Sequence, residues 1–548
     1  MAKNRLRIIP LGGVGEIGRN MTLFEYGENI IVVDAGLMFP ETDMFGVDIV
    51  IPDISYLVER RDIVRGIIIT HGHEDHHGAL PYVLPHVQAP VYATRLTRGL
   101  IEVKLKENRL LERAQLRTID LDKTLTLGPF HLEFFHVCHS VPDAVGLAID
   151  TPVGLVVHTG DYKFDYTPVD GRLTDFHKLA DFGSRGVLVL LADSTNADRP
   201  RYTPSEQEVS DSFDRIFAQA EGRIIVATFA SNISRVQQVM DTAVQYGRRV
   251  GVVGRSMVDN VRMAQELGYL SVPDGTLVRT DELSKLPPEK VTIVCTGTQG
   301  EPTSALVRMA NREHRQVRIQ PGDTVILSAT PIPGNEELVH RTLNNLFRLG
   351  AWVYYQDLLP VHVSGHASQE EQKLMISLTR PKFFVPIQGE YRHLVLHAEL
   401  ARQMGIPREN IFVVESGQVL EFDERSGRVA ETLDGGYVFV DGLGVGDVGT
   451  VVLRDRHLLS QDGFFIAVVA VDKSTGKLVE GPDIISRGFV YLRDSEELLE
   501  EAKQQVIKAL RKRGRSTALD DKIKEVLSRF LYERTKRRPM ILPVVMEV

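Results

Sequence analysis

A dense group of ionisable residues follows an apolar, strand-like run near residue 70. The stretch "IIITHGHEDHHGAL" (67–80) places four imidazoles and two carboxylates in seven consecutive positions. Imidazole and carboxylate groups held close together are the ligands that divalent cations such as Zn²⁺ and Mn²⁺ bind. In the order H-x-H-x-D-H, His71 and His73 can point to one ion while Asp75 and His76 reach a second. Two ions about 3.5–4 Å apart can clamp the attacking and leaving oxygens of a displacement, so the sequence predicts a two-metal hydrolytic centre.

Two further ligands are expected at the ends of other strands. His139 follows "LEFFHVCH" and Asp161 follows "GLVVHTGD". Asp161 suits a bridging position because its two carboxylate oxygens can each bind one ion. We expect Glu74 and His77 to support the ligands or to face solvent. The alternative is a polar surface loop, in which the two distal residues would be unrelated to the first group.

The elements that must position these side chains differ along the chain. Residues 1–204 contain closely spaced short apolar strands, a pattern typical of stacked sheets with helices packed outside. In residues 205–356, strands alternate with amphipathic segments of helix length, which predicts a parallel α/β domain. A glycine-punctuated linker is expected at 441–456, and a small α+β domain at 457–548.

Composition narrows the function classes. The 548 residues carry a net charge of −9, which argues against a protein that coats nucleic acid generically, so an anionic substrate would need a local basic groove. No apolar run reaches the roughly 18 residues of a membrane span, and no membrane partner is expected. The two cysteines cannot form a disulfide framework, and the N-terminal sequence shows no secretory signal. We therefore expect a cytoplasmic protein.

Four motifs resemble the metal-site motifs of the metallo-β-lactamase superfamily: "VVDAG", "THGHEDHHGALP", "CHSVPDA" and "HTGDYKFD". The resemblance implies an αββα sandwich that binds two divalent metal ions, Zn²⁺ or Mn²⁺ or both. The ligands that it implies are His71, His73, Asp75, His76, His139 and Asp161. It also implies that Asp34 orients the site.

The order of motifs resembles the β-CASP nucleases within that superfamily. "LLADSTNAD" is followed by the α/β segment at 205–356 and then by "HVSGHAS" and "PIQGEYRH". The resemblance implies an inserted β-CASP domain, a return to the first domain at 357–440, and a substrate path between the two lobes. It further implies an acidic motif residue at Asp193 and a motif histidine at His366.

Over essentially all 548 residues the chain resembles the bacterial ribonuclease J family, including "PLGGVGEIGRNM", "CTGTQGEP" and "KLVEGPDIISRGFVYL". This implies hydrolysis of single-stranded RNA from a 5′-monophosphate end toward the 3′ end, with additional internal cleavage. It also implies a homodimer or homotetramer formed through the C-terminal domain, and association with other RNA-decay proteins.

One position departs from the pattern. The last motif usually supplies a histidine ligand, whereas this chain has Gln388 in "IQGEYRH", and a neutral amide substitutes poorly for imidazole on a transition metal. We expect His393 to supply the ligand instead; a weaker second site is the alternative. Because DNA-directed relatives also lack this histidine, a DNA nuclease is the nearest rival function. A thioester or lactam hydrolase would not explain the inserted segment, and a nonenzymatic RNA-binding subunit would not need six ligands.

The expected chemistry is attack of a metal-activated hydroxide on phosphorus, with the pKa of the bound water lowered to about 7. His366 is the candidate general acid for the departing 3′-oxygen. Small residues around it would let a phosphate approach closely. A pocket for a 5′-monophosphate is expected from two segments: Ser231 and Asn232, and then His362, Val363, Ser364, Gly365 and His366. Asn232 is also a candidate N-cap of the helix that follows.

Two weaker expectations concern charged side chains. Basic residues of the inserted segment are candidates to track the RNA backbone: Arg235, Arg255, Arg308, Arg312, Arg315 and Arg318. The aspartates Asp43, Asp48 and Asp53 are candidates for a structural cation site near Asp48.

Overall fold

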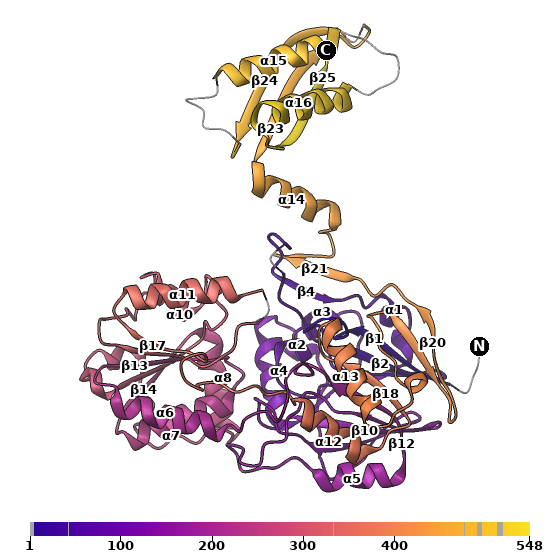
Figure 1. Cartoon of the computed structure of the whole chain (residues 1–548), viewed down its shortest axis with the longest axis vertical. Helices are drawn as coiled ribbons and strands as arrows, with labels where there is room; N and C mark the ends of the chain where they lie inside the picture. The colour runs from indigo at the N-terminus through magenta and orange to yellow at the C-terminus, as the bar shows by residue number, and fades with distance from the viewer. Residues whose placement is uncertain (1–4, 42, 333, 476, 490–495, 512–518) are drawn as a thin grey trace. The chain divides into compact units, whose positions relative to one another are not determined.

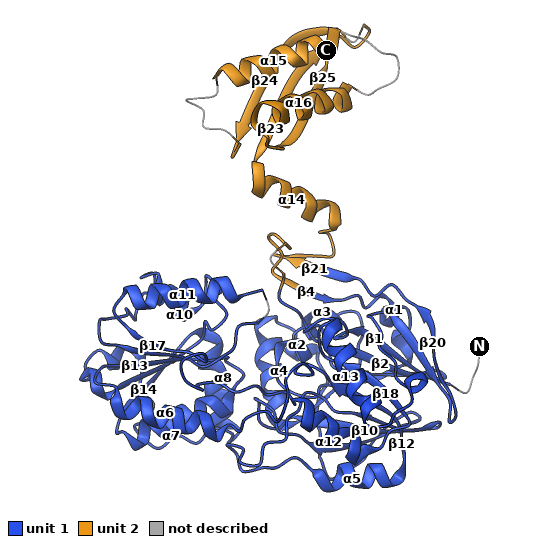
Figure 2. Cartoon of the chain, viewed as in Figure 1, with its two compact units in different colours: residues 1–39, 50–438 blue, residues 40–49, 439–548 orange. Residues whose placement is uncertain are grey.

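The computed structural model describes residues 5–41, 43–332, 334–475, 477–489, 496–511 and 519–548. The chain forms two compact units (Figure 2). The larger unit comprises Met1–Phe39 and Val50–Val438, and the smaller comprises Pro40–Ile49 and Phe439–Val548.

Two facing β-sheets form the centre of the larger unit (Figure 1). The eight-stranded sheet has the order β20 (Gly427–Thr432), β19 (Gln418–Phe422), β1 (Leu6–Gly12), β2 (Met21–Tyr26), β3 (Asn29–Val33), β5 (Val64–Ile68), β6 (Val91–Ala93), β7 (Leu116–Thr118). The six-stranded sheet has the order β18 (Phe383–Ile387), β12 (Val187–Asp193), β11 (Gly154–His158), β10 (Val145–Thr151), β9 (Phe130–His136), β8 (Leu125–Leu127). Apolar side chains of both sheets, among them Phe24, Ile31, Phe134 and Leu147, pack into one buried core.

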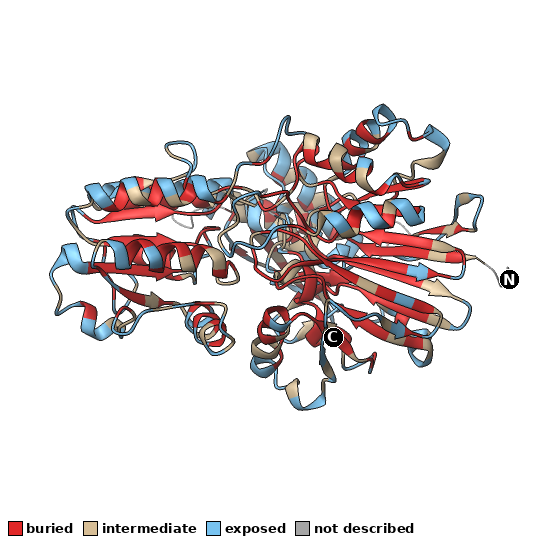
Figure 3. Cartoon of the chain, turned by 90° about the horizontal axis from the view of Figure 1, so that it is seen from below, coloured by how far each residue is buried: buried red, intermediate tan, exposed pale blue. Residues whose placement is uncertain are grey.

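Helices cover the outer faces of this sandwich. On the six-stranded sheet, α5 (Phe176–Arg185), α12 (Gln369–Thr379) and α13 (Tyr391–Gln403) bury apolar residues against the strands. On the eight-stranded sheet, α4 (Arg95–Glu107) lies against β6 and β7. Figure 3 shows the resulting layers, with buried strands and with helices whose exposed residues face outward. The predicted αββα sandwich is confirmed.

The inserted segment forms a five-stranded sheet in which all neighbouring strands are parallel. The order is β14 (Arg249–Val253), β15 (Val291–Cys295), β13 (Ile224–Ala227), β16 (Thr324–Leu327), β17 (Trp352–Tyr354). One face packs against α6 (Gln207–Gln219), α7 (Ile233–Gln245) and α8 (Arg255–Glu266). The other face packs against α10 (Ala305–Ala310) and α11 (Glu336–Arg348). Coverage of both faces explains why these strands read as continuous apolar runs.

The smaller unit contains a three-stranded sheet in the order β24 (Leu478–Arg487), β23 (Phe464–Val471), β25 (Met540–Glu547). Helices α15 (Glu496–Arg511) and α16 (Leu519–Thr535) pack on this sheet through a core that includes Phe465, Val506 and Leu527. A further helix, α14 (Thr450–Asp462), begins inside the segment predicted as a linker. The expected small α+β domain is therefore present. Within the described ranges, no helix has the length and apolar composition that crossing a bilayer requires.

Candidate metal centre

Strand direction brings the candidate ligands to one edge of the sandwich. In the eight-stranded sheet, β3 and β5 are parallel. In the six-stranded sheet, β9 and β11 run the same way because β10 is antiparallel to both, and β12 and β18 continue in that direction. The carboxyl ends of these strands carry or precede the candidate residues: Asp34 after β3, His71 after β5, His139 after β9, Asp161 after β11, Asp193 ending β12 and Gln388 after β18.

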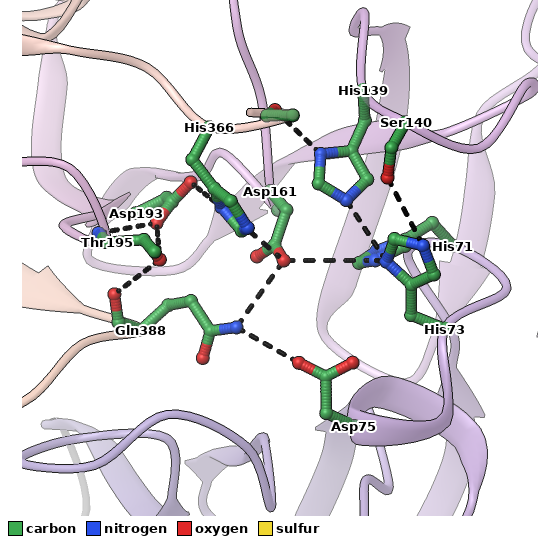
Figure 4. Close-up of polar contacts among 12 residues, drawn as sticks. His71, His73, Asp75, His139, Ser140, Asp161, Asp193, Thr195, His366 and Gln388 are labelled. Carbon is green, nitrogen blue, oxygen red and sulfur yellow. Dashed lines mark hydrogen bonds and ion pairs between the residues drawn. The ribbon is translucent and has the colours of Figure 1, made fainter. Parts of the chain in front are cut away.

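Three imidazoles converge on one point of this edge (Figure 4). Nδ1 of His73 lies 3.0 Å from Nε2 of His71 and 3.1 Å from Nε2 of His139. The other nitrogen of each ring contacts an oxygen. Nδ1 of His71 lies 3.1 Å from Thr70 Oγ1, Nε2 of His73 lies 3.2 Å from Ser140 Oγ, and Nδ1 of His139 lies 2.7 Å from the carbonyl oxygen of Gly365. Burial lowers the pKa of His73 and of His139 to about 3, and that of His71 well below its usual value.

These contacts decide what the three rings can bind. In each neutral ring, the nitrogen that contacts an oxygen carries the proton. The other nitrogen of each ring then has a free lone pair, and the three lone pairs point at one another without a proton among them. A divalent cation satisfies all three, and an oxygen partner on the opposite nitrogen is the usual support for a metal-binding histidine. The donor set therefore fits the metal that the sequence motif implies.

A second group of donors adjoins the first. Nε2 of His76 lies 3.1 Å from Oδ2 of Asp161 and 3.4 Å from Oδ2 of Asp75. Oδ2 of Asp161 is also 3.8 Å from Nε2 of His71, so this carboxylate lies between the two groups. Burial opposes a positive charge on His76, but the carboxylates of Asp161, Asp75 and Asp34 outweigh it and raise the pKa of the ring well above its usual value.

Asp34 contacts the opposite side of the His76 ring. Its Oδ2 lies 2.8 Å from Nδ1 of His76, and its Oδ1 accepts from the backbone N–H of Thr70 at 2.8 Å. Asn20 also reaches the cluster, with Nδ2 3.1 Å from Nε2 of His76 and bonded to the carbonyl of Asp75. Sequence reasoning missed the contributions of Asn20, Thr70 and Ser140, although Asn20 belongs to the quoted stretch "GVGEIGRNM".

Half-buried His366 pairs with the buried Asp193 at the rim of the cluster. Its Nδ1 lies 2.8 Å from Oδ2 of Asp193 and 3.9 Å from Oδ2 of Asp161. Burial lowers the pKa of the ring, but the Asp193 carboxylate and its hydrogen bond prevail and raise it to about 9. His366 therefore carries a proton at neutral pH.

Gln388 and His393 occupy different surroundings. Nε2 of Gln388 lies 3.2 Å from Oδ2 of Asp75 and 3.4 Å from Oδ2 of Asp161. His393, on α13, directs Nε2 toward Asp198 Oδ2 at 3.6 Å. Among the described residues, six side chains form groups of three or more donors that could hold an ion: His71, His73, His76, His139, Asp161 and His366. His393 belongs to none of these groups. Its assignment as a ligand stays a prediction.

The residues of the predicted phosphate pocket lie in two loops, and a hydrogen bond from Arg235 in the first turn of α7 links one to the other. Asn232 caps α7, because its Oδ1 accepts from the backbone N–H of Arg235 at 2.9 Å. Arg235 in turn donates to the carbonyl of Val361 at 2.8 Å, which places the first turn of α7 beside the loop 362–366. Ser364 in that loop accepts from Asn196 at 2.9 Å.

Two secondary expectations have different outcomes. The expectation that Arg235 tracks RNA is wrong, because the side chain is 0% exposed and forms an ion pair with Glu206. Of the other basic candidates, Arg308 is half-buried and the rest are exposed: Arg255, Arg312, Arg315 and Arg318. Asp48 is exposed and accepts a hydrogen bond from Gly442 N at 2.8 Å. In the described residues it belongs to no group of three or more candidate cation ligands, so a cation there stays a prediction.

Family comparisons agree with the fold and the cluster. Four family models match the chain: "Metallo-beta-lactamase superfamily" at 14–226, "Ribonuclease J, beta-CASP domain" at 221–346, "Zn-dependent metallo-hydrolase RNA specificity domain" at 358–414 and "Ribonuclease J C-terminal domain" at 451–548. A solved structure of a protein of unknown function from Enterococcus faecalis V583 covers 76% of this chain and all of its own, with a TM-score of 0.55 at 15% identity. That likeness concerns the fold alone.

The fold and the ligand cluster define a metallo-hydrolase of the metallo-β-lactamase superfamily with a β-CASP insertion. Curated relatives narrow the class further. Ribonuclease J2 of Bacillus subtilis is 45% identical over 99% of both chains, and Ribonuclease J 1 of Streptococcus pyogenes is 46% identical over 99% of this chain and 98% of its own. Ribonuclease J 2 of Staphylococcus aureus strain NCTC 8325 is 41% identical over 100% of this chain. The chain belongs to the ribonuclease J family.

Proposed function

We propose that this protein is a two-metal ribonuclease that degrades and matures single-stranded RNA. It removes nucleotides from a 5′-monophosphate end toward the 3′ end and also cleaves internally. The observation that carries the proposal is the convergence of two donor groups, His71–His73–His139 and Asp75–His76–Asp161, beside the His366–Asp193 pair. Membership of the ribonuclease J family supports RNA as the substrate.

The roles follow from the contacts. When bound, two divalent cations, Zn²⁺ or Mn²⁺ or both, supply activation of a water for attack on phosphorus and neutralise charge on the phosphate oxygens. Asp34 orients the His76 ring through the 2.8 Å contact with Nδ1. His366 donates its proton to the departing 3′-oxygen, and Asp193 holds the ring by the hydrogen bond to Nδ1. His393 remains a candidate for the last ligand position, in competition with Gln388.

Selection of the RNA 5′ end depends on two loops, which the hydrogen bond from Arg235 of α7 to Val361 holds together. Ser231 and Asn232 precede the first turn of α7, where backbone N–H groups favour a phosphate. The loop 362–366 adds the Ser364 hydroxyl, the small Gly365 and backbone groups beside His366. A pocket of this kind fits one phosphate, and a 5′-triphosphate is excluded by its bulk.

The test compares transcripts that differ only at the 5′ end. Purified protein with Mn²⁺ receives 3′-labelled RNA carrying a 5′-monophosphate or a 5′-triphosphate. We expect mononucleotides at a rate at least about 10-fold higher from the monophosphate, which corresponds to about 1.4 kcal/mol. Equal rates would contradict the pocket. The control variants Asp75→Ala and His76→Ala should lose activity on both RNAs.

A DNA nuclease is the second candidate, favoured by Gln388 and by chemistry in which the attacking oxygen is not the 2′-hydroxyl. A 5′-phosphorylated DNA of the same sequence is therefore the third substrate in this assay. Faster release of deoxynucleotides than of ribonucleotides would replace RNA by DNA as the substrate.

Self-association through the C-terminal domain is also part of the proposal. The face of the small sheet opposite α15 and α16 carries apolar side chains in register: Ile466 pairs with Ile485 and with Leu542, and Val468 pairs with Val544. Ile485, Leu542 and Val544 are exposed. A second copy of this chain would bury such a surface in a homodimer or homotetramer.

A cytoplasmic location is also part of the proposal, because the two buried cysteines are free. Other RNA-decay proteins are available as partners in that compartment.

A further inference from the structure

Gln388 occupies a fixed position in the ligand cluster. The residue is 2% exposed, and its backbone has φ of 51°, a left-handed conformation that few residues adopt. Its N–H donates to the carbonyl of Gly13 at 2.6 Å, and its own carbonyl accepts from Ser194 N at 3.1 Å. These bonds hold the main chain so that the amide points at Asp75 and Asp161 (Figure 4).

The amide oxygen of Gln388 lacks a partner. Oε1 is buried and forms no hydrogen bond with the described residues, although the amide nitrogen contacts two carboxylates. Leaving a buried acceptor unsatisfied costs about 1–3 kcal/mol. Half a turn about the last side-chain bond exchanges the two ends of the amide. The amide oxygen then faces the carboxylates of Asp75 and Asp161. Three acceptor oxygens this close together repel one another unless a cation lies among them.

The two donor groups have different chemical character. The first consists of three imidazole nitrogens, from His71, His73 and His139. The second has one imidazole nitrogen, from His76, with carboxylate oxygens from Asp75 and Asp161. Gln388 adds an amide oxygen to the second group where an imidazole would have added a nitrogen. Imidazole-rich sites favour Zn²⁺, whereas carboxylate and carbonyl oxygens favour Mg²⁺ and Mn²⁺.

We propose that Gln388 makes the two metal positions unequal. The three-histidine position holds a tightly bound Zn²⁺. The position of Asp75, His76, Asp161 and Gln388 holds an exchangeable harder cation, Mn²⁺ or Mg²⁺, through Oε1. This inference rests on the proposed two-metal function and specifies its second ion. The enzyme is then hetero-dinuclear, and the supply of the hard cation controls its activity.

The experiment counts metal ions in the full-length chain after chelation and reloading. Protein reloaded with excess Zn²⁺ is dialysed against a weak chelator and analysed for zinc by elemental analysis. We expect the wild type to retain one Zn²⁺ per chain and to take up one Mn²⁺, detected by electron paramagnetic resonance of the free ion. The variant Gln388→His should retain two Zn²⁺, with the affinity of the second rising at least about 10-fold. Two firmly held Zn²⁺ in the wild type, or one in Gln388→His, would overturn the proposal.

Two more variants separate oxygen ligation from other roles. Gln388→Glu keeps the side-chain shape and guarantees an oxygen, so Mn²⁺ affinity should be equal or higher. If the amide serves only as a hydrogen-bond donor to the carboxylates, this variant should bind Mn²⁺ no better than Gln388→Ala. Gln388→Ala should bind Mn²⁺ at least about 10-fold more weakly and still retain one Zn²⁺. Circular dichroism establishes that each variant is folded before metal is counted.

A variant of His393 tests the competing assignment of the last ligand. His393→Ala should leave both ion counts unchanged, because Nε2 of His393 faces Asp198. Loss of the second ion in His393→Ala but not in Gln388→Ala would show that His393 is the ligand and refute the assignment to Gln388. A wild type that binds no ion at either position would instead refute the proposed two-metal function itself, so the two failures are distinguishable.

Discussion

The pair of Asp193 and His366 shows how one hydrogen bond sets the chemistry of a side chain. Asp193 is 1% exposed and also accepts from the backbone N–H of Thr195 at 2.9 Å, so its carboxylate is fixed. The bond at 2.8 Å holds Nδ1 of His366. Because the carboxylate favours the charged ring, the pKa of His366 is raised to about 9.

The residue-scale prediction concerns Asp193→Asn. An amide cannot stabilise the imidazolium as a carboxylate does, so the pKa of His366 should fall from about 9 toward neutrality. Activity that needs the protonated ring is present below that pKa and lost above it, so the alkaline limb of the kcat–pH profile should move to lower pH. We also expect kcat near neutrality to fall by about 10–100-fold.

The control for this profile is Asp181→Asn on α5, an exposed carboxylate far along the chain from His366. An alkaline limb that stays in place in Asp193→Asn would contradict the role of Asp193. His366→Ala, which removes the donor itself, should reduce kcat by about 10²–10⁴-fold and abolish the limb.

At the scale of elements, a buried ionic network joins the inserted domain to the sandwich. Glu206, just before α6, accepts from Arg235 of α7 at 2.6 Å and lies 3.4 Å from Lys163, which follows β11. Arg235 also holds the carbonyl of Val361, next to the loop that carries His366. The network therefore links α7, the strand-end loop of β11 and the loop 362–366.

The element-scale prediction is that Arg235→Ala destabilises the protein by about 3–5 kcal/mol, because Glu206 is left as a buried charge with one cation fewer. Chemical denaturation followed by circular dichroism measures the loss. Replacing both partners, as in Arg235→Met with Glu206→Leu, should recover part of it, since apolar groups then replace the ion pair and Lys163 keeps Asp165 at 3.3 Å as its partner.

The matched control is Arg312→Ala, an exposed arginine of the same inserted domain. Its stability should stay within about 0.5 kcal/mol of the wild type. If Arg235→Ala were equally mild, the network would not stabilise the junction. If the double variant lost more stability than Arg235→Ala, the buried charge would not be the cause of the loss.

At the scale of the whole molecule, the candidate metal ligands and the exposed apolar face of the small sheet belong to different units. The larger unit contains every group of candidate metal ligands found among the described residues. The smaller unit carries a sheet with helices on one face and exposed apolar side chains on the other. The proposed assembly and the proposed chemistry can therefore be tested by separate substitutions.

The prediction at this scale is that Leu542→Asp with Val544→Asp converts an oligomer to a monomer, because two like charges on the open sheet face cannot be buried without partners. Light scattering coupled to size-exclusion chromatography gives the mass. Lys524→Glu, an exposed position on α16, is the control and should leave the mass unchanged. An oligomer that survives the double substitution would place the interface elsewhere.

The local sequence was sufficient to predict which residue types form the candidate metal-binding cluster and how the strands and helices are arranged. The spacing of His71, His73, Asp75 and His76 specifies two donor groups because a short loop at a strand end limits where each side chain can point. Apolar strand runs separated by turns predict the sandwich, and alternating strands and helices predict the parallel inserted sheet, because each pattern reflects which faces are buried. Relationship to a known family supplied the order of the domains.

Tertiary structure decided which of several chemically similar residues reaches the site. Only packing across the sandwich turns Gln388 toward Asp75 and directs His393 toward Asp198, although the two are five positions apart. Arg235 is buried only because the inserted domain packs against the sandwich. The residues next to it in the sequence do not show whether it is buried or exposed. The physical reason is that residue type and spacing determine what a side chain can bind, whereas contacts between segments distant in sequence determine what it meets.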